Sequence, residues 1–175
     1  MLRLFVGIPL PPEQKLGLSL IASGLPGAKW VDPGNYHLTL RFIGEVGESD
    51  AADIDAALAG IRARRFSLAL AGVGHFGTRV LWAGIEKNPD LLHLHAKVET
   101  ALIRAGLAPE GRRYAPHVNL ARLNGAPNPK LTAYLAAHAL FRAEPFAVDR
   151  FALVASYLTK AGPIYEDQAE YELGK

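Results

Sequence analysis

The chain has no cysteine and almost no net charge, and these absences exclude several classes of protein. Without cysteine among its 175 residues there is no disulfide, no thiolate nucleophile and no thiolate metal site, which fits a reducing compartment. Lysine and arginine number 19 against 17 aspartates and glutamates, a formal charge of +2. No strong overall field therefore attracts nucleic acid or an anionic membrane, and any anion must bind through local contacts.

The sequence also lacks an apolar run near the roughly 20 residues that a membrane-spanning helix needs. Pro9, Pro11 and Pro12 follow the start too closely for the apolar core of a signal peptide. We therefore expect a soluble cytoplasmic protein without membrane contact. Hydrophobic residues make up 50% of the chain, which is enough to bury a core within one domain.

Apolar patterns and turn residues divide the chain into strands and helices. Alternating or short apolar stretches predict strands at residues 2–10, 37–46, 65–76, 80–85, 117–123 and 150–159. Apolar residues at helical spacing predict helices at residues 13–25, 49–61, 88–107 and 131–140. Beyond the last strand we expect a polar tail. Because hairpins are present and a glycine-rich phosphate loop is not, the order favours an α+β architecture over a doubly wound sheet.

Two of these strands open with a histidine that is followed two places later by a polar residue. Side chains alternate between the faces of a strand, so the run HLTLRF places His37, Thr39 and Arg41 on one face. The run HVNLAR repeats the arrangement with His117 and Asn119. Residues two apart lie about 6.5 to 7 Å from each other along a strand, so both can reach one group the size of a phosphate.

Two histidines that face one cleft suit a reaction that needs an acid and a base together. Imidazole titrates near pH 6.5, and each such proton transfer typically contributes about 10² to 10⁴ in rate. The hydroxyl of Thr39 and the amide of Asn119 would then hold the non-bridging oxygens of the substrate. A single such histidine is more often an ordinary half-buried residue, but two copies in apolar strands favour catalysis.

The motifs HLTL and HVNL, the opening RLFVGIPLPP, the strand VLWAGI and the run YAPHVNLAR together resemble the 2H phosphoesterase superfamily. Within it, they are similar to the RNA 2′,3′-cyclic phosphodiesterases, also called LigT-like 2′-5′ RNA ligases. The resemblance extends from Arg3 to about Ser156. It implies a bilobal α+β fold in which two mostly antiparallel sheets flank a central cleft, with helices outside. Residues 1–175 would form a single domain of two pseudo-symmetric lobes, each supplying one histidine motif.

The resemblance also implies a reaction. Members of the family open 2′,3′-cyclic phosphates at RNA ends to 2′-phosphomonoesters without a metal or cofactor, and the reverse reaction would form a 2′-5′ linkage as a side activity. His37 and His117 would be the acid and the base, and we assign His117 as the base and His37 as the acid. The expected partners are RNA ends or nucleotides that carry a 2′,3′-cyclic phosphate. We expect a monomer.

Four residues are candidates for binding the phosphate. Thr39 matches a phosphate contact of the family, whereas Asn119 stands where the family usually has Thr or Ser and offers a longer, planar amide. Arg122, five residues after the second histidine, matches a phosphate-binding arginine. Strict alternation places Arg122 on the face opposite His117, so Arg122 reaches the cleft only through a bulge, a strong twist or the nearby end of the strand. Arg41 lies on the His37 face and is the arginine that the alternation itself favours.

Two aromatic residues and a further pair of histidines give weaker signals. Phe76 and Phe5 are candidates for stacking on a nucleobase, with packing against the core as the alternative. His93 and His95 resemble a metal pair, but positions two apart on a helix diverge by about 200°, so we expect no metal site there.

Other functions stay open from the sequence alone. The same chemistry could serve small cyclic nucleotides or 2′-5′ oligonucleotides, and Asn119 is compatible with a non-catalytic module that binds RNA or nucleotides. A metal-dependent hydrolase is a further alternative. Comparing activity on short RNAs with activity on mononucleotides separates an RNA enzyme from one that acts on small cyclic nucleotides. Activity that is insensitive to a chelator excludes a metal-dependent hydrolase.

Overall fold

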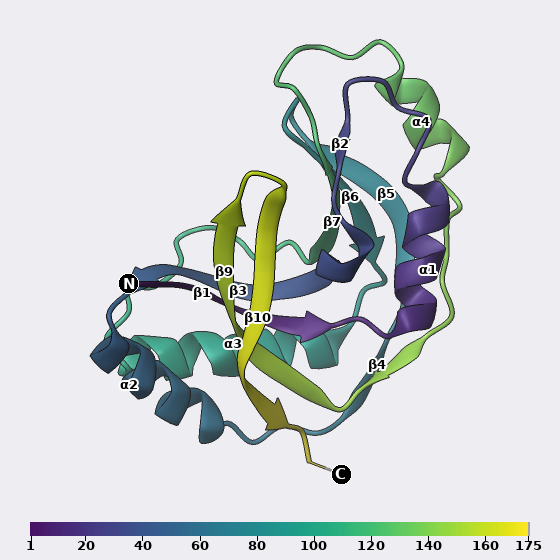
Figure 1. Cartoon of the computed structure of the whole chain (residues 1–175). Helices are drawn as coiled ribbons and strands as arrows, with labels where there is room; N and C mark the ends of the chain where they lie inside the picture. The colour runs from purple at the N-terminus through teal and green to yellow at the C-terminus, as the bar shows by residue number, and fades with distance from the viewer. Residues whose placement is uncertain (175) are drawn as a thin grey trace.

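Two antiparallel sheets form the framework of the chain, of which the computed structural model describes residues 1–174 (Figure 1). The first sheet has the strand order β10-β9-β1-β3 and consists of β1 (Leu2–Pro9), β3 (His37–Val46), β9 (Arg150–Thr159) and β10 (Gly162–Glu172). The second has the order β2-β7-β6-β5 and consists of β2 (Lys29–Trp30), β5 (Leu70–Phe76), β6 (Val80–Ile85) and β7 (His117–Arg122). A short pair joins β4 (Phe66–Leu68) to β8 (Phe146–Val148).

The helices lie outside these sheets. Figure 1 shows α2 (Glu48–Ala59) and α3 (Pro89–Arg104) together beside the first sheet, and α1 (Pro12–Ile21) and α4 (Leu131–Ala137) on the side of the second. A single 3₁₀ turn, η1 (Pro33–Asn35), leads directly into β3. The predicted α+β fold of antiparallel sheets with outer helices is confirmed.

Helix α3 contributes a stripe of buried residues to the core. The side chain of Asn88 accepts a hydrogen bond from the Leu91 amide at 3.1 Å and caps the helix. Leu94, Val98 and Leu102 follow at helical spacing and are fully buried. One hydrophobic core takes residues from both sheets and from each helix named above, so the two histidine strands are attached to a common interior.

A β-bulge interrupts β3 at the third residue after its histidine. Two neighbouring residues of β1 pair with Thr39 and Arg41, so Leu40 is an extra residue between them. The faces of the strand are exchanged beyond this point. Arg41 is 8% exposed and belongs to the buried side, whereas Phe42 is 49% exposed. The strict alternation assumed for HLTLRF therefore fails after Thr39.

The second histidine strand carries a bulge at the equivalent place. Two neighbouring residues of β6 pair with Asn119 and Ala121, so Leu120 is the extra residue. Arg122 thereby returns to the exposed face that His117 and Asn119 share, while Leu120 and Ala121 are both buried. Of the alternatives considered for Arg122, the structure contains the bulge.

The main difference from the predicted elements lies near the C-terminus. Residues 162–172 form β10, which pairs with β9 along its length, and do not form a polar tail. As the outer strand of its sheet, β10 carries mostly exposed polar residues, so its apolar alternation is weak. The stretch 65–76 also divides into β4 and β5, which pair with different strands.

Candidate active site

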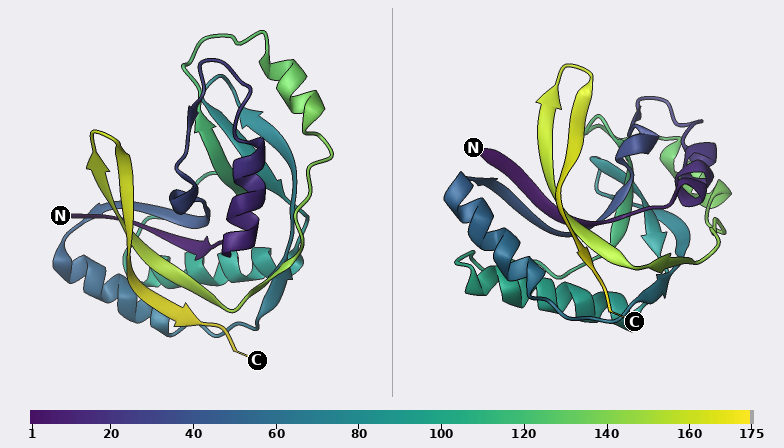
Figure 2. Two further views of the ribbon diagram at one scale, coloured as in Figure 1. Left: turned by 45° about the vertical axis from the view of Figure 1, so that its right-hand side comes forward. Right: turned by 60° about the horizontal axis from the view of Figure 1, so that its bottom comes forward.

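A cavity of about 790 Å³ lies between the two histidine strands. The loop of η1, the start of β2 and the turn of the β9–β10 hairpin complete its walls. Both views in Figure 2 show the tip of this hairpin projecting from the first sheet. Five of the predicted site residues line the cavity together: His37, Thr39, His117, Asn119 and Arg122.

The imidazole of His37 is oriented by hydrogen bonds at both ring nitrogens. Nδ1 lies 2.8 Å from the backbone oxygen of Asn35, and because a carbonyl only accepts, Nδ1 carries the proton of the neutral ring. Nε2 lies 2.8 Å from Oγ1 of Thr39. In the neutral state the Thr39 hydroxyl donates to Nε2, and in the charged state Nε2–H donates to the hydroxyl. Thr39 can therefore support either protonation state of His37.

Aromatic rings enclose His37 on two sides. Phe5 stacks on the imidazole with the ring centroids 4.5 Å apart, and Tyr165 meets it edge-on at 5.2 Å. Burial lowers the pKa of His37 because it disfavours the charged ring. The hydrogen bond to the Asn35 carbonyl partly offsets this, and the nearby charges of His117 and Lys15 lower the pKa further.

His117 has a more open environment. Its Nδ1 donates to the backbone oxygen of Ala115 at 2.7 Å, which again leaves Nε2 as the nitrogen that takes up a proton. The ring meets Phe76 edge-on at 4.8 Å, with Trp82 at 6.2 Å. Within residues 1–174 no hydrogen bond joins Asn119 to His117, so the amide of Asn119 is available to a ligand.

Glycine makes room for the indole beside His117. A Cβ atom placed on Gly74 would lie 2.3 Å from the ring of Trp82, closer than any side chain permits. Trp82 pairs with Asn119 across the β6–β7 ladder, so its ring lies next to the second histidine motif. A larger residue at position 74 would displace the indole and, with it, the packing around His117.

Positive charge gathers along the wall that belongs to the second sheet and the hairpin turn. Arg122, Lys29, Arg79 and Lys160 line the cavity, with Asp32 as the acidic residue among the lining residues. An anion that enters the cavity therefore meets an excess of cationic side chains. The positive charge is thus concentrated on one wall of a chain whose formal net charge is only +2.

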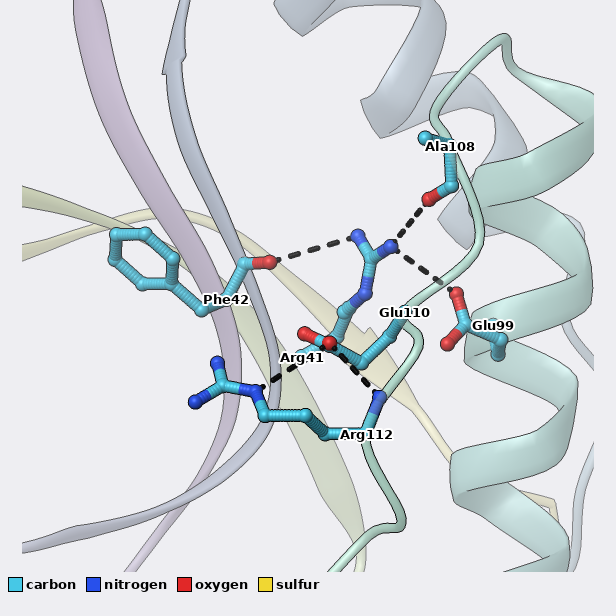
Figure 3. A network of polar contacts seen from close by, with 6 residues as sticks. All are labelled: Arg41, Phe42, Glu99, Ala108, Glu110 and Arg112. Carbon is cyan, nitrogen blue, oxygen red and sulfur yellow. Dashed lines mark hydrogen bonds and ion pairs between the residues drawn. The ribbon is translucent and has the colours of Figure 1, made fainter.

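Arg41 does not reach the cavity, which corrects its predicted role in phosphate binding. Figure 3 shows its guanidinium turned toward α3, where Nη2 lies 2.6 Å from the Ala108 carbonyl oxygen and 3.4 Å from a carboxylate oxygen of Glu99. The bulge at Leu40 explains the error, because it moves Arg41 to the buried face of β3. Through its hydrogen bond to Ala108, Arg41 connects the segment after α3 to the first sheet.

The position of Phe5 contradicts its predicted role in stacking on a nucleobase. It is only 5% exposed and does not line the cavity, so it cannot offer a face to a nucleobase. Its ring packs on His37, Tyr165 and its own sheet. Phe76 does not line the cavity either, but it is 42% exposed, and its ring contacts His117 edge-on at 4.8 Å and Trp82 at 5.4 Å. Phe5 therefore packs in the interior, whereas Phe76 remains a candidate for stacking on a base.

Within residues 1–174 there is no group of three or more histidine, cysteine or acidic side chains placed to hold a metal ion. His95 stacks on Tyr114 with the ring centroids 3.8 Å apart and belongs to the packing of α3. In the same part of the chain, no helix is long and apolar enough to cross a membrane.

Sequence reasoning missed Tyr165 and Asn35. Tyr165 lies in the stretch expected to be a polar tail, and the signal that could have placed it is weak because β10 is an outer strand. Asn35 contributes its backbone oxygen to His37, which depends on the geometry of η1 and has no sequence pattern of its own.

Comparison with known proteins identifies the family of the chain. The family described as LigT like Phosphoesterase matches the chain over residues 8–82 and 84–165. The chain belongs to this family. Among LigT-like relatives, the RNA 2′,3′-cyclic phosphodiesterase of Aeropyrum pernix is 40% identical over 154 residues, which is 85% of this chain and 87% of that protein. The relative of the same name from Archaeoglobus fulgidus is 30% identical over 98% of this chain and its own full length.

Solved structures share the whole fold. A protein of Thermus thermophilus superposes with a TM-score of 0.83 at 28% identity, covering 99% of both chains. The E. coli LigT structure complexed with 3′-AMP has a TM-score of 0.81 at 26% identity, again over 99% of both chains.

Proposed function

We propose that this protein hydrolyses 2′,3′-cyclic phosphates at RNA ends to 2′-phosphomonoesters. The observation that carries this function is the pair of oriented imidazoles, His37 and His117, on the two strands that line one basic cavity. The relatives named RNA 2′,3′-cyclic phosphodiesterase, at up to 40% identity over most of the chain, support the same activity.

The two imidazoles supply a complete acid–base pair. Neutral Nε2 of His117 takes a proton from water as the water oxygen bonds to phosphorus. The bond between phosphorus and O3′ breaks, and Nε2–H of His37 gives its proton to the departing oxygen. The phosphate stays on O2′. After the step His117 is protonated and His37 is neutral. Proton exchange with solvent then returns both imidazoles to their starting states.

Burial supports this division of roles. His117 has the more open surroundings and can contact a solvent water, whereas His37 lies among Phe5, Tyr165 and Thr39. Because burial lowers the pKa of His37, its imidazolium is a stronger acid than an exposed one. The negative charge of the bound cyclic phosphate favours the protonated ring, so the substrate itself promotes the reactive state.

The phosphate lies between donors from both strands in this proposal. The hydroxyl of Thr39, the amide of Asn119 and the guanidinium of Arg122 face the cavity and can donate to its non-bridging oxygens. Donors fixed on strands stabilise the charge that develops at phosphorus without reorganising. Asn119 takes the place of a hydroxyl here and acts through its NH₂ group.

An RNA end is the substrate that the surroundings favour over a mononucleotide. Lys29, Arg79 and Lys160 extend the positive wall beyond the residues that touch one phosphate, and a mononucleotide has no second phosphate diester to meet them. The exposed face of Phe76 beside His117 offers a surface for the terminal base. The protein is proposed to act as a cytoplasmic monomer, and with a 5′-hydroxyl RNA in place of water the same groups would form a 2′-5′ linkage.

The test compares a short RNA that ends in a 2′,3′-cyclic phosphate with the matching nucleoside 2′,3′-cyclic phosphate, both with excess chelator. We expect a 2′-phosphate product from both and a higher kcat/KM for the RNA. Loss of activity with chelator would instead indicate a metal-dependent hydrolase. Binding of RNA without turnover of either substrate would indicate a non-catalytic binding module.

A further inference from the structure

Asn35 contacts two separate parts of the active site. Its backbone oxygen accepts the hydrogen bond from Nδ1 of His37 at 2.8 Å. Its side-chain Nδ2 donates to the backbone oxygen of Pro163, also at 2.8 Å, across 128 positions of sequence. One residue therefore joins the turn before the first histidine to the β9–β10 hairpin.

The hairpin places Tyr165 on the imidazole that Asn35 orients. Tyr165 follows Pro163 by two residues on β10, and its ring meets those of His37 and Phe5 edge-on at 5.2 and 5.1 Å. The tip of the hairpin has little packing of its own, since Leu158 is 74% exposed and Ile164 is 56% exposed. Where so few contacts exist, a single hydrogen bond has a large effect on the position of the tip.

We propose that Asn35 is a positioning residue whose side chain holds the β9–β10 hairpin, and with it Tyr165, over the imidazole of His37. The inference rests on the acid–base function proposed above and assigns a role to a side chain that transfers no proton itself. By keeping Tyr165 in place, Asn35 limits the access of water to the acid and fixes the ring for proton transfer to the departing oxygen.

The protonation of His37 reports on this contact directly. Burial is the main cause of its lowered pKa, the Asn35 carbonyl opposes that effect, and the charges of His117 on β7 and Lys15 on α1 add to it. Tyr165 from β10 is uncharged at neutral pH, and burial raises its pKa against the nearby charges of Arg3 and Arg122. Replacing Asn35 by alanine keeps the backbone carbonyl and every one of these charges. A change in the pKa of His37 in this variant therefore reports a change in the hydration of its ring.

The experiment follows the imidazole of His37 by NMR across pH in the wild type and in Asn35→Ala. We expect the pKa of His37 to rise toward the ordinary value of about 6.5 in the variant, and kcat/KM to fall by about tenfold. Asn128→Ala is the matched control, because Asn128 Nδ2 donates to the Pro26 backbone oxygen at the same 2.8 Å and lies outside the cavity. The control should leave the pKa of His37 and the kinetics unchanged.

A second variant tests whether Asn35 acts through Tyr165. Tyr165→Leu should raise the pKa of His37 by itself, and the double variant with Asn35→Ala should raise it no further. An unchanged pKa of His37 in folded Asn35→Ala overturns the proposal, as does a shift that adds fully to that of Tyr165→Leu. Because the titration needs no substrate, these results are independent of whether the protein cleaves cyclic phosphates.

Discussion

Replacing Arg41 by methionine should destabilise the protein without impairing its chemistry. Arg41 is 8% exposed, pairs with Glu99 at 3.4 Å and donates to the Ala108 carbonyl at 2.6 Å. The variant leaves a largely buried carboxylate without its partner. Breaking a buried pair on one side costs about 3 to 5 kcal/mol. The low end, about 3 kcal/mol, applies here because 19% of the Glu99 side chain is exposed.

For a chain of this size, a loss of about 3 kcal/mol lowers Tm by roughly 6 to 12 °C. Calorimetry would measure this loss, and adding Glu99→Leu should restore much of it by removing the unpaired charge. Steady-state kinetics below the transition should give kcat/KM within about twofold of wild type. Arg122→Met is the matched control, with near wild-type Tm and kcat/KM reduced by about tenfold or more. A stable Arg41→Met protein with lost activity would refute the reasoning and return Arg41 to the phosphate.

Three further outcomes are expected. Asn119→Ala should lower kcat by about 10²-fold because a donor to the phosphate is lost, while Asn119→Thr keeps a donor and should stay within about tenfold; an unimpaired alanine variant in steady-state assays would contradict this role. Phe76→Ala should raise KM for a cyclic-phosphate RNA by about fivefold or more, since stacking typically contributes about 1 to 3 kcal/mol per base, and an unchanged KM would remove Phe76 from the site. Because burial lowers the pKa of His37, the unfolded chain binds more protons between that pKa and about 6.5, so the free energy of unfolding should fall as the pH drops through this window. Urea melts at about pH 7.5 and about pH 5.5 would measure the loss, which should be smaller in His37→Asn than in wild type, and an equal loss in both would exclude His37 as a source.

Local patterns in the sequence carry much of the fold because they arise from burial. The cap at Asn88 and the stripe through Leu94, Val98 and Leu102 determine α3 without reference to the rest of the chain. β10 could not be predicted in the same way, because an outer strand with polar exposed residues is recognised only by its pairing with β9.

The positions of the two arginines show where sequence reasoning about the site reaches its limit. Period-two alternation predicts the face of a strand residue only up to the first bulge, and bulges at Leu40 and Leu120 exchange the faces in both histidine strands. Alternation therefore favoured Arg41 and opposed Arg122, and the structure reverses both. The pattern of β-bulges depends on pairing with β1 and β6, which no single strand sequence contains.

The rings around His37 could not be derived from its own strand either. Phe5 comes from β1 and Tyr165 from β10, and both reach the imidazole only once the first sheet has formed. The sequence pointed to the residues that we propose carry the chemistry, but the surroundings that adjust the protonation of His37 come from distant parts of the chain.

The most direct test of the two-histidine mechanism measures turnover of an RNA 2′,3′-cyclic phosphate by His37→Ala and His117→Ala. His75→Ala is the control, because Nδ1 of His75 also bonds a backbone carbonyl, that of Gly77 at 2.8 Å, but the residue does not line the cavity. The account predicts that each active-site variant loses about 10² to 10⁴ in kcat, while the control keeps wild-type activity and yields a 2′-phosphate. Retention of near wild-type kcat by either active-site variant would contradict it.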